Sequence, residues 1–211
     1  MLDKYFLNNI SRLFNEKNYN EVILKIEQNI KINDRPPDLT NLCAVSKLLK
    51  ANRSKDDVIS ALNDFEVYYQ KSYKNFQKIE AVSNFIVTCI TNVQEFKEII
   101  PYFKKAQKLY EDCEEKIGYD KKLYSHGADL YKYTLNHYKN RKILNELINN
   151  KTDNKNVACT YGYMSNYTYD WGIKEYFDYS KKFEHYFPKH KVKNINEINY
   201  KENKKIRIGF V

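Results

Sequence analysis

Two short motifs recur along the chain at nearly constant spacing, and this recurrence restricts the fold more than any other feature. Residues 44–49, Ala-Val-Ser-Lys-Leu-Leu, reappear at 81–86 as Ala-Val-Ser-Asn-Phe-Ile, 37 residues later. A polar pair followed by two β-branched residues occurs in segments 19–26, 55–62 and 96–103, at offsets of 36 and 41 residues. Helix pairs that recur at such periods are typical of solenoids, whose units bury their apolar faces only by stacking.

Apolar residues follow helical spacing through most of the chain. The segments with this spacing are 2–14, 22–30, 42–49, 58–69, 79–90, 99–109, 123–138 and 143–148. Only 5 Gly and 4 Pro occur in 211 residues, which opposes a β sandwich or barrel with many turns. The sequence therefore predicts an all-α fold.

Helix boundaries are predicted from proline, glycine and capping residues. The Pro36-Pro37 pair is expected to interrupt the helical structure, and Asp38 is expected to cap the helix that follows. Ser54 with Asp57 resembles a capping box at the start of the next helix. Asn92 with Glu95 is expected to begin a helix that runs through residue 109, and Gly118 is expected to stop it.

Residues 96–109 resemble the second helix of a tetratricopeptide repeat. Phe103 and Ala106 occupy positions where that family places an aromatic and a small residue, which lets two helices approach closely. Ile99 stands where the family usually has a small residue, and the Trp, Gly and Tyr of the first helix are missing. The resemblance implies a degenerate tetratricopeptide-like solenoid over residues 1–148. An ordinary helical bundle is the alternative.

The last quarter of the chain differs in character. Residues 149–156 form a polar run that we expect to be a loop, and aromatic residues then follow helical spacing up to Pro188. The segment 189–205 is a basic connector. Residues 206–211, Ile-Arg-Ile-Gly-Phe-Val, resemble a buried β-strand whose neighbouring strands are absent from the chain. We therefore divide this part into a helical region, 149–187, and a linker with one orphan strand, 188–211.

Helical repeats are followed by an aromatic-rich helix, a basic linker and a short strand. With its parts in this order, the segment 158–211 resembles the region leading into the catalytic domain of family 41 glycosyltransferases. These are tetratricopeptide-bearing enzymes similar to protein O-linked N-acetylglucosamine transferase, including bacterial relatives. The resemblance implies sugar transfer from UDP-N-acetylglucosamine to Ser or Thr of proteins. It also implies that the catalytic His and the donor-binding residues would follow Val211, so we assign no catalytic or cofactor-binding residue and leave enzymatic activity open.

Two functions are consistent with these patterns. The first is the amino-terminal repeat region of a family 41-like enzyme, inactive alone, which meets a UDP-sugar only in the full-length protein. The second is a free-standing helical-repeat adaptor. In both, stacked repeats offer a groove for a protein or peptide partner. From the register of the two Ala-Val-Ser motifs, Asn41, Ser83 and Asn84 are the candidates to line that groove.

Charge suggests a third partner class, nucleic acid. The chain has 36 Lys and Arg against 27 Asp and Glu, and the excess is concentrated in residues 174–211. Lys outnumbers Arg 31 to 5, however, whereas base reading and phosphate forks favour Arg. No recognised nucleic-acid-binding motif accompanies the basic residues, so we do not expect nucleic acid as a partner.

Other functional classes lack the residues that they need. No stretch approaches the roughly 18 consecutive apolar residues of a membrane span, and the amino-terminal segment does not resemble a signal peptide. We therefore expect a cytoplasmic protein. The four cysteines show no metal or redox spacing, so we expect reduced, mostly buried thiols. No two histidines are three or four residues apart, which argues against a metal site on one helix face.

Overall fold

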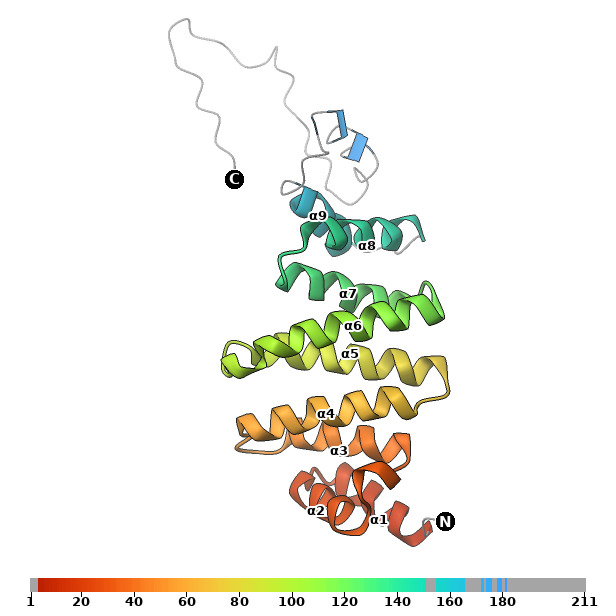
Figure 1. Cartoon of the computed structure of the whole chain (residues 1–211), viewed down its shortest axis with the longest axis vertical. Helices are drawn as coiled ribbons and strands as arrows, with labels where there is room; N and C mark the ends of the chain where they lie inside the picture. The colour runs from red at the N-terminus through yellow and green to blue at the C-terminus, as the bar shows by residue number, and fades with distance from the viewer. Residues whose placement is uncertain are drawn as a thin grey trace, which may run out of the picture. The chain divides into compact units, whose positions relative to one another are not determined.

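A computed structural model describes residues 4–150 and 155–165, together with residues 172, 174, 175, 178, 179 and 181. Within these residues the secondary structure is helical, without a strand, which confirms the predicted all-α class. The helices, shown in Figure 1, are α1 (Lys4–Asn15), α2 (Tyr19–Asn29), η1 (Ile32–Asp34), α3 (Pro37–Leu49), α4 (Lys55–Lys71), α5 (Asn75–Asn92), η2 (Lys97–Ile99), α6 (Ile100–Ile117), α7 (Lys121–Tyr133), α8 (His137–Asn149) and α9 (Lys155–Ser165).

The chain divides into two compact units, Met1–Asp170 and Trp171–Val211. Helices α1 to α9 belong to the first unit. In the second unit only a few residues are described, among them Gly172, whose amide donates to Glu175 at 2.8 Å. The predicted orphan strand at 206–211 lies outside the described residues, as does most of the segment 166–205.

Several helix ends follow the predicted local chemistry. Ser54 and Asp57 form a reciprocal capping box at the start of α4, as predicted. Gly118 follows α6 with φ of 76°, a conformation that glycine adopts without steric cost, so the predicted stop is confirmed. Asp120 and Asn136 cap α7 and α8 by accepting hydrogen bonds from backbone amides.

Other predicted boundaries were wrong. Helix α3 begins at Pro37, whose fixed φ suits the first turn, so Asp38 is inside the helix and accepts a hydrogen bond from Gln77 instead of capping. Asn92 ends α5 and donates to the carbonyl of Thr88, and the next α-helix starts only at Ile100. Polar residues such as Asn serve both ends of helices, and the sequence alone did not separate these roles.

Two further differences concern the carboxyl-terminal helices. The predicted continuous face over residues 123–138 is interrupted after Tyr133, because Leu135 adopts a φ of 57° and its side chain is 73% exposed. The predicted loop at 149–156 is shorter than expected, since α9 already begins at Lys155. The apolar residues of α9 lie on more than one side of the helix, since Ala158 and Met164 are buried and Tyr163 is exposed. They give no one-sided stripe, so the sequence did not assign a separate helix here.

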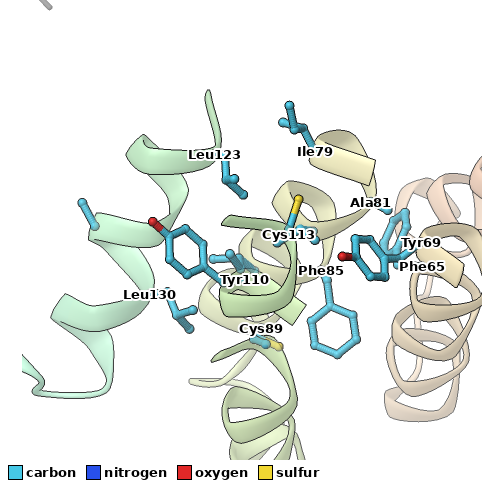
Figure 2. Packing of buried hydrophobic residues seen from close by; sticks show 14 of the residues in the cluster. Phe65, Tyr69, Ile79, Ala81, Phe85, Cys89, Tyr110, Cys113, Leu123 and Leu130 are labelled. Carbon is cyan, nitrogen blue, oxygen red and sulfur yellow. The ribbon is translucent and has the colours of Figure 1, made fainter. Parts of the chain in front are cut away.

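Consecutive helices pack against each other from α1 to α9, and α5 also packs against α7. Buried apolar residues form two separate clusters. The smaller one joins α1, α2 and the start of α3, and ends at Cys43. The larger one begins at the adjacent Ala44 and extends to Met164. Figure 2 shows part of the larger cluster, where Tyr110 of α6 points towards α7, close to Leu123 and Leu130.

Tyr110 and Gly127 show how closely α6 and α7 approach. A Cβ atom added to Gly127 would lie only 2.2 Å from Cε2 of Tyr110, so this position requires glycine. The Tyr110 ring also meets the ring of Tyr131 edge to face, with 5.7 Å between centroids. None of the helices in the described ranges is both long enough and apolar enough to cross a membrane.

Candidate functional site

Hydrogen bonds join α3 to α5, two helices that are not consecutive in the chain. The side-chain amide of Gln77 donates to the Asp38 carboxylate at 2.9 Å, and the amide of Asn84 donates to Oδ1 of Asn41 at 3.3 Å. The residues of these two pairs are 39 and 43 positions apart. The structure therefore brings together two of the three residues predicted to line a groove.

The same pattern occurs between α4 and α6. Lys105 forms an ion pair with Glu66, and the hydroxyl of Tyr69 donates to the Asp112 carboxylate. These pairs are again 39 and 43 positions apart. The contacts between α3 and α5 and those between α4 and α6 thus show the same two separations along the sequence.

The three predicted groove residues differ in exposure. Asn41 and Asn84 are half-buried. Helical spacing places the exposed Val87 and Thr91 on the side of α5 that carries Asn84, and the half-buried Val45 one turn after Asn41 on α3. We call these five residues the α3–α5 face. Ser83 is only 1% exposed, so it belongs to the interior and does not line a surface. It occupies the buried side of α5 because a one-residue step on a helix turns the side chain by about 100°.

Lys47 is the centre of a buried polar cluster between α2, α3 and α4. Its Nζ lies 2.6 Å from Oδ2 of Asp64, 2.8 Å from the Ser60 hydroxyl and 2.8 Å from Oε1 of Glu27. The side chains of Lys47 and Asp64 are 5% and 2% exposed. Buried charges of this kind are tolerated only when they are paired and hydrogen-bonded.

Arg35 completes this group, which we call the Lys47 cluster (Glu27, Arg35, Lys47, Ser60 and Asp64). Its NH1 is 3.7 Å from Oδ1 of Asp64, and its Nε donates to the carbonyl of Ile30 at 3.0 Å. Two cations thus face two carboxylates, and the formal charges cancel. The cluster lies where the two apolar clusters meet, because Cys43 and Lys47 are one turn apart on α3.

The chemistry of the Lys47 cluster is that of a structural site. Burial opposes the charged form of Lys47, but its surroundings, including two hydrogen-bonded carboxylates, raise its pKa above the ordinary value, so it stays protonated. Burial raises the pKa of the neighbouring Cys43 thiol to about 11, although Lys47 and Arg35 oppose the shift. A thiol with this pKa is not a nucleophile at neutral pH. Sequence reasoning missed this cluster, because lysine is usually exposed and its partners Glu27 and Asp64 lie on other helices.

Four buried tyrosines donate hydroxyl hydrogen bonds to carboxylates, and burial is the main reason that the pKa of each lies above its ordinary value. Their hydroxyls therefore remain neutral donors at physiological pH. The pairs are Tyr68 with Glu80, Tyr69 with Asp112, Tyr110 with Glu114 and Tyr131 with Glu111.

Metal and thiol chemistry finds little support in the residues that the structure describes. Within them, no group of three or more His, Cys, Asp or Glu residues is placed to hold a metal ion. Cys43, Cys89 and Cys113 are buried free thiols and Cys159 is an exposed one, so most of the cysteines are buried, as predicted. Burial lowers the pKa of His126, so it is mainly neutral at pH 7.

Comparisons with protein-family models, curated proteins and solved structures find no match to this chain. The resemblances to tetratricopeptide repeats and to family 41 glycosyltransferases therefore stay predictions from the sequence. The segment that carries the second resemblance, 158–211, falls mostly outside the described residues.

Proposed function

We propose that α3 to α8 form a tetratricopeptide-like solenoid of helical hairpins that binds an extended segment of a protein partner. The observation that carries this proposal is the recurrence of the 39- and 43-residue separations between α3 and α5 and between α4 and α6. Stacked helical hairpins of similar length are expected to repeat such separations from one pair of helices to the next. The packing of α5 against α7 extends the same relation to the next hairpin.

The α3–α5 face has the chemistry of a peptide-binding surface. In the bond between its two asparagine side chains, Nδ2 of Asn84 donates to Oδ1 of Asn41. Nδ2 of Asn41 and Oδ1 of Asn84 keep a donor and an acceptor with no partner among the described residues, and this pair complements one peptide unit of an extended chain. Val45 and Val87 flank the amides and offer apolar contact to side chains.

Peptide binding is common to both functions considered from the sequence. In an enzyme similar to family 41, the α3–α5 face would help to select the protein acceptor, and in a free-standing adaptor it would hold a partner. The resemblance of residues 158–211 favours the first. In either case we expect no sugar transfer by this chain and no micromolar binding of UDP-N-acetylglucosamine. Calorimetry with that nucleotide sugar tests the binding directly.

The proposal is tested by selecting displayed peptides on the immobilised protein and measuring their affinity by fluorescence polarisation. The double substitution Asn41→Ala and Asn84→Ala removes two hydrogen bonds of about 0.5–1.5 kcal/mol each, so we expect affinity to fall by about tenfold. The matched control is Asn63→Ala, which removes an exposed amide from α4. Equal affinities for the double variant and the control would refute peptide binding at the α3–α5 face.

A further inference from the structure

The turn that joins α7 to α8 exposes three large side chains (Figure 1). Leu135 in the turn is 73% exposed, and Tyr133 and Tyr138, on either side of it, are 48% and 66% exposed. We call these three residues the α7–α8 tip. None of them belongs to the α3–α5 face or to either apolar cluster, so the packing of the described helices does not account for them.

Leu135 adopts a backbone conformation that leucine disfavours. Its φ of 57° lies in the left-handed region, which glycine and asparagine adopt more easily. Its amide donates to the carbonyl of Lys132 at 3.2 Å, and the amide of Asn136 donates to the carbonyl of Tyr131 at 2.9 Å. These are the two backbone bonds of a Schellman motif, which ends α7.

The same motif ends α1, and there a polar residue occupies the left-handed position. Lys17 has a φ of 58° and is exposed. Its amide donates to the carbonyl of Phe14 at 3.0 Å, and the amide of Asn18 donates to the carbonyl of Leu13 at 2.9 Å. The turn therefore forms without an apolar side chain at this position, so the side chain of Leu135 is available for a contact outside the fold.

The charges of α7 and α8 closest to the α7–α8 tip are positive. Residues 130–145 contain four Lys or Arg and no Asp or Glu. Of these, Lys132 and Lys142 are exposed and form no ion pair within the part of the chain that the structure describes. The nearest acidic residues of the two helices, Asp129 and Glu146, each lie about one helical turn further from the tip.

Helix α6 brings a third lysine towards the same place. The side-chain amide of Gln107 donates to the hydroxyl of Thr134 at 3.1 Å, which holds the middle of α6 beside the end of α7. Lys104 precedes Gln107 by three residues and so lies on the same side of α6. It is exposed, and no ion pair of its ammonium group is found among the described residues.

We propose that the α7–α8 tip inserts into the surface of a membrane that carries anionic lipids. The leucine side chain enters the boundary between headgroups and acyl chains, and the two tyrosines lie at the interface, where aromatic rings with a polar end are enriched. The lysines attract the anionic headgroups. Nucleic acid has the same charge, but it offers no apolar environment for an exposed leucine. A contact of this kind is peripheral and requires no membrane-spanning helix.

The test is flotation of the full chain with vesicles of phosphatidylcholine and phosphatidylserine, compared with vesicles of phosphatidylcholine alone. We expect binding to the anionic vesicles and at least about tenfold weaker binding to the neutral ones. Lys132→Gln combined with Lys142→Gln should weaken binding to the anionic vesicles about twentyfold, since each lysine near such a surface contributes about fivefold. No binding to the anionic vesicles, or an unchanged affinity of the double variant, would overturn the proposal.

Leu135→Asn separates insertion of the tip from simple attraction between a basic chain and an anionic surface. Asparagine suits the φ of 57° and leaves the net charge unchanged, so the fold should be kept while vesicle affinity falls at least about fivefold. The matched control is Leu24→Asn, which removes a leucine that is 47% exposed on α2 and should leave the affinity unchanged.

Equal vesicle affinities for Leu135→Asn and Leu24→Asn would refute insertion of the α7–α8 tip. If Leu135→Asn weakened the binding of the selected peptides but not of the vesicles, the tip would contact a protein partner, and the membrane proposal would be wrong. These outcomes do not affect the α3–α5 face, because its test uses substitutions on other helices.

Discussion

Replacement of Lys47 by methionine tests the Lys47 cluster. Methionine keeps an unbranched stem of similar length and removes the ammonium group. Asp64, whose side chain is 2% exposed, would then keep only the more distant contact with Arg35 at 3.7 Å, and Ser60 would lose its donor. Breaking a buried ion pair by removing one partner costs about 3–5 kcal/mol. Since Arg35 remains nearby, we expect a loss of free energy of unfolding near 3 kcal/mol.

The measurement is urea denaturation followed by circular dichroism at 222 nm, with Lys105→Met as the control. Lys105 pairs with Glu66 at the surface, with side chains 40% and 24% exposed, so its removal should cost less than about 1 kcal/mol. In 1 M NaCl the effect of Lys105→Met should largely disappear, whereas that of Lys47→Met should persist, because salt screens exposed pairs more than buried ones. A loss for Lys47→Met no larger than that of the control would refute the structural role of the cluster.

Three further predictions concern packing, acid stability and thiol access. Gly127→Ala should lower the free energy of unfolding by about 1–3 kcal/mol, because the new Cβ overlaps the ring of Tyr110. Urea denaturation measures this loss, and an unchanged midpoint would contradict the predicted overlap. Hydrogen bonds, chiefly from lysines, lower the pKa of Glu111 and Asp112, so these carboxylates stabilise the fold above pH 5, and this contribution is lost as pH falls through their folded-state pKa values. Thermal melting midpoints should therefore decrease between pH 5 and 3, and constant midpoints would contradict this expectation. A thiol reagent should modify Cys159 rapidly in the folded protein and the other three cysteines only on unfolding, since burial raises the pKa values of these three to between about 11 and about 12. Fast modification of all four thiols would disprove the burial of Cys43, Cys89 and Cys113.

Local patterns in the sequence predicted the features that depend on nearby residues. The apolar stripe of α5 and the capping box of Ser54 with Asp57 involve residues within one or a few helical turns, and the structure confirms both. The role of Asn92 was wrong, because an asparagine serves the start or the end of a helix according to the backbone around it.

Long-range pairings were the part that the sequence did not predict. The motif register named Asn41, Ser83 and Asn84 as groove candidates, but it predicted neither the hydrogen bond between the two asparagines nor the burial of Ser83. Lysine is a residue type usually found at the surface. Lys47 is buried because its ammonium group pairs with the carboxylate of Asp64, which is 17 positions later in the chain.

The separation of the two apolar clusters affects how the chain folds as it leaves the ribosome. The smaller cluster is complete once Cys43 has been made, so α1, α2 and the start of α3 have their apolar partners before α4 exists. Beyond it, the described hydrogen bonds span at most 43 residues, and each new hairpin finds its neighbour already present. Such short spans keep the entropy cost of loop closure low. Assembly can therefore follow the order of synthesis, and no apolar face must wait for a distant part of the chain.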